Sequence, residues 1–527
     1  MKKSIFILAI IFFLGTIFTF AQPSIQWQKT IGGNNYDYKP KIQLTKDGGY
    51  IIAENSSSSI SGDKVENNLS TDIWIIKLDS IGNIIWQNTI GGNEGDNTTN
   101  IHQTFEGGYI VSGNSISGIG GDKTDSCYGN FDYWILKLDE LGNLEWQKTF
   151  GGNELDESNS IQQTADSGFI IAGYSFSGIS GDKLEPSLGL SDYWILKLNK
   201  FGDITWQNTI GGGDYDNANS IKQTFDGGFI VAGESYSEIS GDKSEPKQAA
   251  DFWVLKLDNL GNIIWQNTIG GISSDIPIEI QQTPDSGYII AGISSSNISG
   301  DKSEANIGNW DCWIVKLDVQ GNILWQNTIG GFAVDAIQDF EQTIDGGFIL
   351  AAFSQSGIGG DKTEPCFGVS DFWIIKLDAI GNVVWENTIG GNGYDVAYSI
   401  KQKADGSYVV VGDSDSPNSG DKTDNCKGFH DLWVLKIQPD VLTLNEKNSI
   451  LSYNIFPNPT NGIIHIQSIT KYKLRITDLQ ILNLQGQVLL QESNNNEVDI
   501  SSLSNGVYFL QLTNERMEKL VYKVIKE

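Results

Sequence analysis

The chain has 527 residues with 60 glycines, 11 prolines and 11% aromatic residues, a composition that suits many short strands and tight turns around a sizeable core. The formal net charge is −30, and an acidic surface repels phosphate backbones, so the sequence argues against a nucleic acid partner. The 3 histidines are far apart in the sequence, which gives little support to a Ser-His-Asp or histidine-metal site.

Residues 1–21 have the features of a secretory signal peptide. Lys2 and Lys3 form a basic start, an apolar stretch runs to Phe20, and Ala21 completes a small-x-small cleavage site before Gln22. No later segment reaches the length of about 18 apolar residues that a membrane-spanning helix needs. We therefore expect export of the chain and no transmembrane segment in its mature form.

Residues 25–439 contain seven copies of one unit of about 60 residues, and each copy carries two tryptophans. The first tryptophan precedes a double glycine, at Trp27, Trp86, Trp146, Trp206, Trp265, Trp325 and Trp385. The second follows an aspartate by two positions, at Trp74, Trp134, Trp194, Trp253, Trp313, Trp373 and Trp433. A fixed period of this size indicates a solenoid, a propeller or an array.

Four strands are predicted in each unit. In residues 144–199 they are LEWQKTF, NSIQQT, FIIAGYSFS and YWILKLN, and turns containing Gly, Asp or Ser separate them. The runs are rich in Ile, Val, Phe, Tyr and Trp, which favours strand over helix. Several are apolar on both faces, as expected for sheets that are covered on both sides.

These patterns predict an all-β fold, a seven-bladed β-propeller of four-stranded blades. The chain starts with a tryptophan strand, and none follows Trp433 where it is due, so we expect the N-terminal strand to complete the last blade and close the ring. An open β-solenoid is the alternative. In plan the region resembles kelch and WD propeller repeats, but it lacks the WD dipeptide, so no function of those families is transferred.

Three aspartates recur in every unit, and we expect all of them on loops of one face of the disc. They are, in order of position within the unit, Asp37, Asp96, Asp156, Asp216, Asp275, Asp335 and Asp395; Asp63, Asp122, Asp182, Asp242, Asp301, Asp361 and Asp421; and Asp72, Asp132, Asp192, Asp251, Asp311, Asp371 and Asp431. The first set, together with Trp310 of the irregular fifth unit, is a candidate binding face for Ca²⁺, a cation or a sugar.

The alternative for these aspartates is structural: each would cap loop amides of its own unit. We favour it because a residue present in every unit usually serves the unit. No Ca²⁺ loop of the D-x-[DN]-x-[DN]-G type is present, so the sequence implies no cofactor. A lysine also recurs within the fourth strand, for example Lys197, and we expect it to pair with a repeated carboxylate.

The innermost strands should line the axis of the ring. A glutamine recurs there at Gln103, Gln163, Gln223, Gln282, Gln342 and Gln402, which predicts an amide-lined channel that holds water or a small ligand. Cys127, Cys366 and Cys426 occupy the same offset in three units. A Cys366–Cys426 disulfide would require loops that lean inward, because the two Cα atoms must come within about 7 Å.

The repeat ends after Pro439. Residues 440–452 are predicted to be a linker, and residues 453–527 contain alternating runs such as GIIHIQ and GVYFLQL that indicate half-buried strands. Their motifs resemble the C-terminal type A sorting domain of type IX secretion substrates. The matching positions are Phe456, Pro457, Asn458, Pro459, Gly462, Gly486, Gln487, Leu503, Asn505, Gly506, Tyr508, Phe509 and Lys523.

The resemblance implies a small Ig-like β-sandwich that the type IX secretion machinery recognises. It also implies passage through the periplasm, followed by release or attachment at the outer-membrane surface. The sequence thus predicts a secreted or cell-surface propeller that binds a glycan or protein ligand without catalysis. A carbohydrate-active enzyme that uses carboxylates on the loop face, and a structural or adhesion protein, remain the alternatives.

Overall fold

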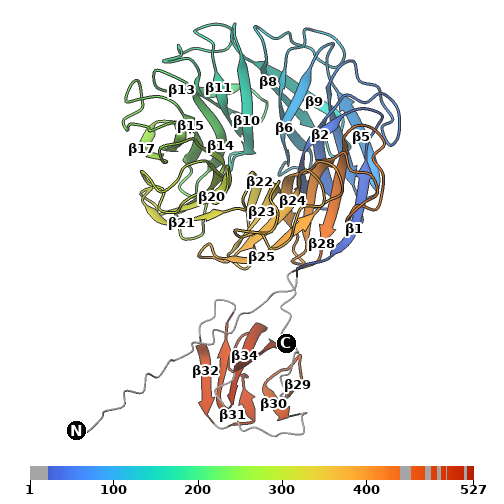
Figure 1. Ribbon diagram of the computed structural model, residues 1–527, viewed down its shortest axis with the longest axis vertical. Coiled ribbons are helices and arrows are strands. Elements are labelled where there is room, and N and C mark those ends of the chain that lie inside the picture. The colour runs from blue at the N-terminus through green and yellow to red at the C-terminus, as the bar shows by residue number, and fades with distance from the viewer. Residues whose placement is uncertain are drawn as a thin grey trace, which may run out of the picture. The chain divides into compact units, whose positions relative to one another are not determined.

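The computed structural model describes residues 22–439, 453–468, 476–483, 488–493, 495–514 and 519–526. The predicted signal peptide and linker lie outside this part of the chain. The chain divides into two compact units, Met1–Leu442 and Thr443–Glu527, which Figure 1 shows in blue to orange and in red. The described residues include no helix long and apolar enough to span a membrane.

The larger unit consists of seven four-stranded antiparallel sheets, here called blades 1 to 7 (Figure 1). Blade 1 contains β2 (Asp37–Leu44), β3 (Tyr50–Ser56), β4 (Asp72–Leu78) and β5 (Ile84–Ile90); blade 2 contains β6 (Asp96–Gln103), β7 (Tyr109–Ser115), β8 (Asp132–Leu138) and β9 (Leu144–Phe150). Blade 3 contains β10 (Asp156–Gln163), β11 (Phe169–Ser175), β12 (Asp192–Leu198) and β13 (Ile204–Ile210); blade 4 contains β14 (Asp216–Gln223), β15 (Phe229–Ser235), β16 (Asp251–Leu257) and β17 (Ile263–Ile269).

Blade 5 contains β18 (Asp275–Gln282), β19 (Tyr288–Ser294), β20 (Asp311–Leu317) and β21 (Ile323–Ile329); blade 6 contains β22 (Asp335–Gln342), β23 (Phe348–Ser354), β24 (Asp371–Leu377) and β25 (Val383–Ile389). Blade 7 contains β26 (Asp395–Gln402), β27 (Tyr408–Ser414), β28 (Asp431–Ile437) and β1 (Ile25–Ile31). The predicted seven-bladed, all-β architecture is confirmed, with one repeat of the sequence per four strands.

Strand β1 pairs with β28 at the far end of the repeat region, as the phase of the repeat predicts. The pairing is antiparallel and places Gln28 opposite Leu435 and Ile31 opposite Leu432. One core cluster combines Val409 and Val434 of blade 7 with Ile52 of blade 1. The N-terminal strand therefore completes the sheet of the last blade, and the first and last blades share a core (Figure 1).

Each blade is covered on both faces by its neighbours, which explains the apolar runs. All seven residues of β12 are buried, and the second tryptophan of every unit is 0% exposed. Between blades, the ring of Tyr133 packs 4.9 Å from that of Trp194. Because each unit carries a large aromatic surface that only the next unit can cover, the blades stabilise one another.

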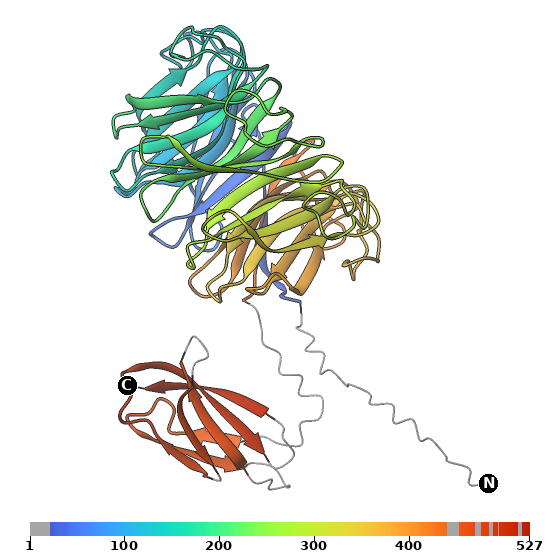
Figure 2. The ribbon, with the colours of Figure 1, turned by 90° about the vertical axis from the view of Figure 1, so that its left-hand side faces the viewer.

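The smaller unit is a β-sandwich of two sheets (Figure 2). One sheet contains β29 (Tyr453–Phe456), β30 (Ile463–Ser468) and β33 (Glu497–Asp499), and the other contains β32 (Val488–Ser493), β31 (Ile476–Leu482), β34 (Gly506–Asn514) and β35 (Lys519–Lys526). Ile464 and Val498 from the first sheet and Ile481 and Leu510 from the second meet in one core. Alternating apolar residues on each strand supply this core.

Candidate functional site

The first repeated aspartate of each unit is buried and hydrogen-bonded within its own unit. Asp156 is 0% exposed, and its Oδ2 accepts hydrogen bonds from the Gly152 amide at 2.6 Å and the Ser177 hydroxyl at 2.9 Å. The same contacts recur at Asp37, Asp96, Asp216, Asp275, Asp335 and Asp395. This set presents no exposed carboxylate to a ligand, and its geometry matches the capping alternative.

The other repeated acids also hold loop backbone. Asp192 Oδ2 accepts from the Leu188 amide, and Glu185 Oε2 accepts from the Thr209 amide at 2.7 Å. In the G-D-K motif, Asp63 accepts from the Gly32 amide at 3.1 Å. Burial raises the pKa of Asp192 to about 6. Among the described residues, no three His, Cys, Asp or Glu side chains converge to hold a metal ion.

The repeated lysines form two further parts of the unit. The lysine of each G-D-K motif lies over the ring of the second tryptophan, as Lys64 does over Trp74 at 4.6 Å. The lysine on the third strand of each blade, such as Lys197 of β12, pairs with a carboxylate, as predicted. The pairs are Lys77–Asp47, Lys137–Glu145, Lys197–Asp166, Lys256–Asp226, Lys316–Asp285, Lys376–Asp345 and Lys436–Asp405.

The recurring glutamines do not line the axis, so the sequence predicted the wrong amides for the channel, whose lining instead includes Gln43, Gln281 and several asparagines. Gln163 Oε1 instead accepts a hydrogen bond at 2.7 Å from the Phe105 amide of the preceding blade. Gln103, Gln223, Gln282 and Gln402 make the same contact. For Gln342 the matching residue of the preceding blade is Pro284, which has no amide hydrogen to donate. Successive side chains on a strand point to opposite sides, so when the residue before the glutamine faces the axis, the glutamine itself faces the neighbouring blade.

The four cysteines are free thiols. Cys127 Sγ donates to the Ser115 carbonyl oxygen at 2.8 Å, and Cys366 and Cys426 make the equivalent contacts. In the third unit Ser187 occupies this offset and contacts the Ser175 carbonyl oxygen. The shared cysteine offset therefore reflects a loop hydrogen bond, and the Cys366–Cys426 disulfide considered from the sequence is not formed.

A polar cavity of about 720 Å³ lies on the axis of the larger unit, lined by the innermost strand of every blade. The lining comes from strand positions that differ between units. The residue before the recurring glutamine faces the cavity in five blades, at His102, Lys222, Gln281, Glu341 and Lys401, and Gln43 does so in blade 1, where Leu44 replaces the glutamine. A volume of this size falls within the range of about 300–1,000 Å³ that is usual for small-molecule sites.

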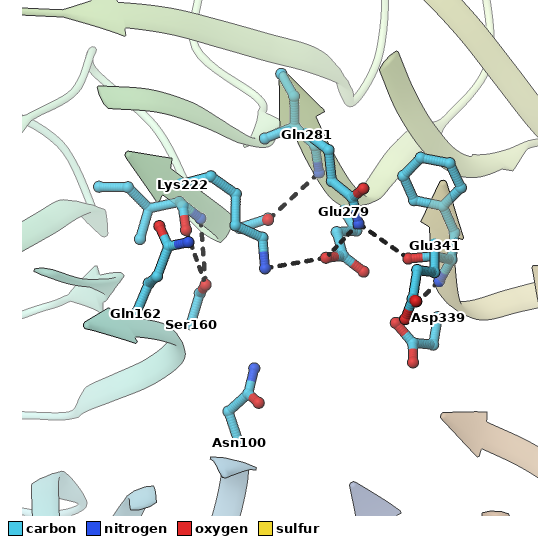
Figure 3. A network of polar contacts seen from close by, with 12 residues as sticks. Asn100, Ser160, Gln162, Lys222, Glu279, Gln281, Asp339 and Glu341 are labelled. Atoms are coloured by element: carbon cyan, nitrogen blue, oxygen red, sulfur yellow. Dashed lines mark hydrogen bonds and ion pairs between the residues drawn. The ribbon is translucent and has the colours of Figure 1, made fainter. Parts of the chain in front are cut away.

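The ion pairs of the cavity lie on blades 4 to 7, and two further lysines lie on blade 1 and one further carboxylate, Glu157, on blade 3. Figure 3 shows Lys222 of β14 paired with Glu279 of β18, at a distance of 3.0 Å. Lys401 of β26 lies 2.9 Å from Asp339 and 3.4 Å from Glu341, both on β22. Coulombic attraction from the two carboxylates raises the pKa of Lys401 despite its burial, and the same pairing lowers the pKa of Asp339.

The opposite wall of the cavity, on blades 2 and 3, is polar but carries no charged pair. Thr99, Asn100, His102, Asn159 and Ser160 line it, and in Figure 3 the amide of Asn100 stands in the open centre, apart from the charged network. The cavity thus has one half with ion pairs and one half without, where the single carboxylate, Glu157, accepts a hydrogen bond from the Tyr174 hydroxyl at 2.5 Å. The sequence analysis did not identify these residues. A signal was present, because these positions differ between the seven units while the Gln and Thr that follow them recur.

The two remaining sets of predicted site residues lie elsewhere. Trp310 is partly exposed and is not part of the cavity lining, and its backbone carbonyl oxygen accepts a hydrogen bond from the Asp335 amide at 2.8 Å. In the smaller unit, Asn458 Oδ1 accepts from the Ile525 amide, and the Tyr508 hydroxyl donates to the Ser504 carbonyl oxygen at 2.7 Å. Phe456, Pro457 and Pro459 are exposed in the segment around Asn458.

Among the other sorting-motif residues, Gly462 directly precedes β30 and Gly506 is the first residue of β34. Lys523 pairs through its backbone with Phe509, and Gly486 lies outside the described residues. Residues 454–527 match the family described as the secretion system C-terminal sorting domain. The smaller unit is a sorting domain of this family. It implies recognition by the type IX secretion machinery and export to the cell surface or secretion.

The repeat region has two distant curated relatives. Regulatory protein FlaEY of Caulobacter vibrioides is 21% identical over 228 residues, which cover 41% of this chain and 24% of that protein. A WD repeat-containing protein, L264, of Acanthamoeba polyphaga mimivirus is 20% identical over 509 residues, which cover 74% of this chain and 36% of that protein. The chain therefore spans well under half the length of both relatives.

Solved structures show only weak likeness. The Pan2 WD40 domain of Neurospora crassa has a TM-score of 0.40 at 9% identity, covering 79% of this chain and 96% of that one. A protein of unknown function from Dyadobacter fermentans has a TM-score of 0.39 at 11% identity, covering 79% of this chain and 99% of that one. The assignment of the fold rests on the strand pairing itself.

Proposed function

We propose that the protein is an exported binding protein without catalytic activity, and that its ligand enters the axial cavity of the propeller. One contrast carries the proposal. The side chains shared by all units are engaged within the repeat, whereas side chains that differ between units gather in the cavity. A binding site needs such asymmetry, and a cavity with a few convergent polar groups is the usual form of a small-molecule site.

The alternatives make different use of the loop face. A carbohydrate-active enzyme would need free carboxylates there, whereas Asp156 and its equivalents are buried beneath loop amides. Binding is therefore favoured over hydrolysis. A structural or adhesion role would be favoured if the cavity takes no ligand.

The binding role can be tested by screening the purified full chain against glycan and peptide libraries. Asn159→Trp should fill the cavity and abolish binding, because Asn159 lines it. Asp125→Trp, at an exposed loop position, is the matched control and should bind normally. The absence of any ligand, or a ligand whose affinity is unchanged in Asn159→Trp, would contradict the proposal.

The export role can be tested separately in the producing cell. Removal of residues 453–527 should leave the propeller in the periplasm, because the sorting domain would be missing. The intact chain, followed by the same fractionation and surface-labelling protocol, provides the comparison. Surface display that persists without the domain would show that export does not depend on it.

A further inference from the structure

Two of the four lysines that line the axial cavity, the exposed Lys39 and the less exposed Lys41, have no carboxylate partner among the described residues, and Lys41 is the one held among buried groups. Lys222 and Lys401 both contact carboxylates, but among the described residues Lys41 makes no ion pair within 4.0 Å. Its Nζ donates only to the carbonyl oxygens of Gln338 at 3.4 Å and Tyr398 at 3.2 Å. Burial lowers the pKa of Lys41, because removal from water disfavours the charged ammonium. An incoming anion would supply the missing partner.

The neighbouring strand β6 offers two uncharged groups to the same cavity. His102 Nδ1 lies 2.6 Å from Gln43 Oε1, which can only accept, so Nδ1 carries the proton and Nε2 is an acceptor. This Nε2 is buried and makes no hydrogen bond of good geometry within the described residues. Burial, together with Lys222 and Lys401, lowers the pKa of His102 to about 3 against the opposing effects of Asp339 and the Ile161 backbone, which keeps the ring neutral.

Asn100 lies two residues before His102 on β6, so both side chains project from the same face of the strand. Its Oδ1 accepts from the Ile101 amide at 2.9 Å. Its Nδ2 has no hydrogen-bond partner within the described chain, and Figure 3 shows the amide standing free in the cavity. One ligand hydroxyl could donate to His102 Nε2, and another could accept from Asn100 Nδ2.

We infer that the axial cavity binds a small acidic carbohydrate, a molecule with one carboxylate beside several hydroxyl groups, of which a hexuronate is the simplest example. The inference rests on the proposed function and names its ligand class. The carboxylate would pair with Lys41, and hydroxyls would meet His102 and Asn100. A free uronate and the acidic end of a glycan chain share this chemistry.

The charges of the cavity favour this class over two others. A cationic ligand would meet three carboxylates that Lys222 and Lys401 already neutralise, and Glu157, whose Oε2 already accepts from the Tyr174 hydroxyl. A neutral sugar could satisfy His102 and Asn100 but would leave the ammonium of Lys41 without a counter-ion, at a cost in affinity. Only a ligand that combines an anion with hydroxyls engages all three groups.

The test is calorimetric titration of the full chain with sodium glucuronate, with glucose as the neutral probe. Glucuronate should bind more tightly than glucose, and Lys41→Met should weaken it by about tenfold or more, the usual scale for a lost charge-assisted hydrogen bond. His102→Phe should weaken both sugars. Lys200→Met, which removes an exposed turn lysine, should leave affinity unchanged, and circular dichroism should show that every variant is folded.

Two sets of outcomes separate this inference from the proposed function. If glucuronate and glucose bind alike, or if Lys41→Met binds glucuronate normally, the assignment to acidic carbohydrate is overturned. If glucuronate fails at about 10 mM but a library compound binds and is lost in Asn159→Trp, the ligand class is wrong and the cavity remains a binding site. An oligosaccharide with a terminal uronate that outcompetes the free acid would identify a glycan end as the source.

Discussion

At the scale of single residues, the repeated acids are structural because one oxygen of each carboxylate, Oδ2 in Asp156, accepts hydrogen bonds from loop groups of the repeat. Asp156 is 0% exposed and accepts hydrogen bonds from the Gly152 amide and the Ser177 hydroxyl. A buried donor left without its acceptor costs about 1–3 kcal/mol. Recurrence in seven units therefore reflects seven identical loops, and the sequence left this interpretation open beside the binding one.

Substitution of one such acid tests that interpretation. Asp156→Ala should lower the free energy of unfolding by about 1–3 kcal/mol, because the Gly152 amide loses its partner. Asp125→Ala, at an exposed loop acid of the neighbouring unit, should change it by no more than about 0.5 kcal/mol. Urea denaturation measures both. Equal, small effects of the two substitutions would mean that the carboxylate does not hold the loop.

At the scale of elements, neighbouring blades fit through paired positions on β-strands. An aromatic ring on the third strand of one blade lies against a glycine on the second strand of the next, as Phe252 of β16 does against Gly292 of β19. Between blades 5 and 6 the corresponding pair is Cys312 with Ala352. Here Cys is smaller than the Phe of the other pair, and Ala is larger than its Gly. A smaller side chain on one blade leaves room for a larger one on the next, which explains why these two positions change together between units.

A double-mutant cycle tests this pairing. Gly292→Ala should destabilise the propeller by about 1–3 kcal/mol, because the added Cβ would lie 2.6 Å from the ring of Phe252. In the Phe252→Cys background, which reproduces the Cys312–Ala352 pair, the same change should cost less, with a coupling of about 1 kcal/mol or more. Thermal unfolding of the four proteins gives the cycle, and strictly additive costs would refute the exchange.

At the scale of the whole molecule, the ends of the repeat region are joined through one sheet. Strand β1 supplies the outer edge of blade 7, so its removal would expose the backbone of β28 and uncover part of the core next to Trp433. An unpaired strand edge of this kind is a template for association between molecules.

Deletion of residues 22–31 should therefore lower the Tm and convert the protein into oligomers on size-exclusion chromatography. A synthetic peptide of residues 22–31 should restore much of the loss by pairing with β28, whereas a peptide of the same composition in scrambled order should not. A deletion variant that stays monomeric with an unchanged Tm would show that the strand adds little to the ring.

Acidic groups across the molecule also set the dependence of stability on pH. Burial raises the pKa of Asp72, Asp251 and Asp431 to about 6 and that of Asp132 to about 7. Unfolded aspartates titrate near 4, so the folded protein binds protons more tightly between these values. The free energy of unfolding should therefore fall as pH rises through this window.

We expect the Tm to be higher near pH 5.5 than near pH 7.5, by about 2 °C or more. Asp132→Asn should reduce this difference, because the residue no longer titrates. Asp125→Asn serves as the control and should preserve the slope. Differential scanning calorimetry at both pH values measures the effect, and a Tm that rises toward pH 7.5 would contradict the assignment.

The period, the two tryptophans and the phase of the repeat determined the architecture and the pairing of β1 with β28, the last strand of the repeat region, because local strand pattern and unit count specify a ring of blades. The motifs of the tail likewise determined the sorting domain. The ligand cavity was decided only by tertiary structure. His102 and Lys41 lie 61 residues apart in the sequence, and which of two adjacent strand positions faces the axis depends on how the blades pack. A one-position difference moves a side chain from the cavity to the blade interface, as the recurring glutamines show.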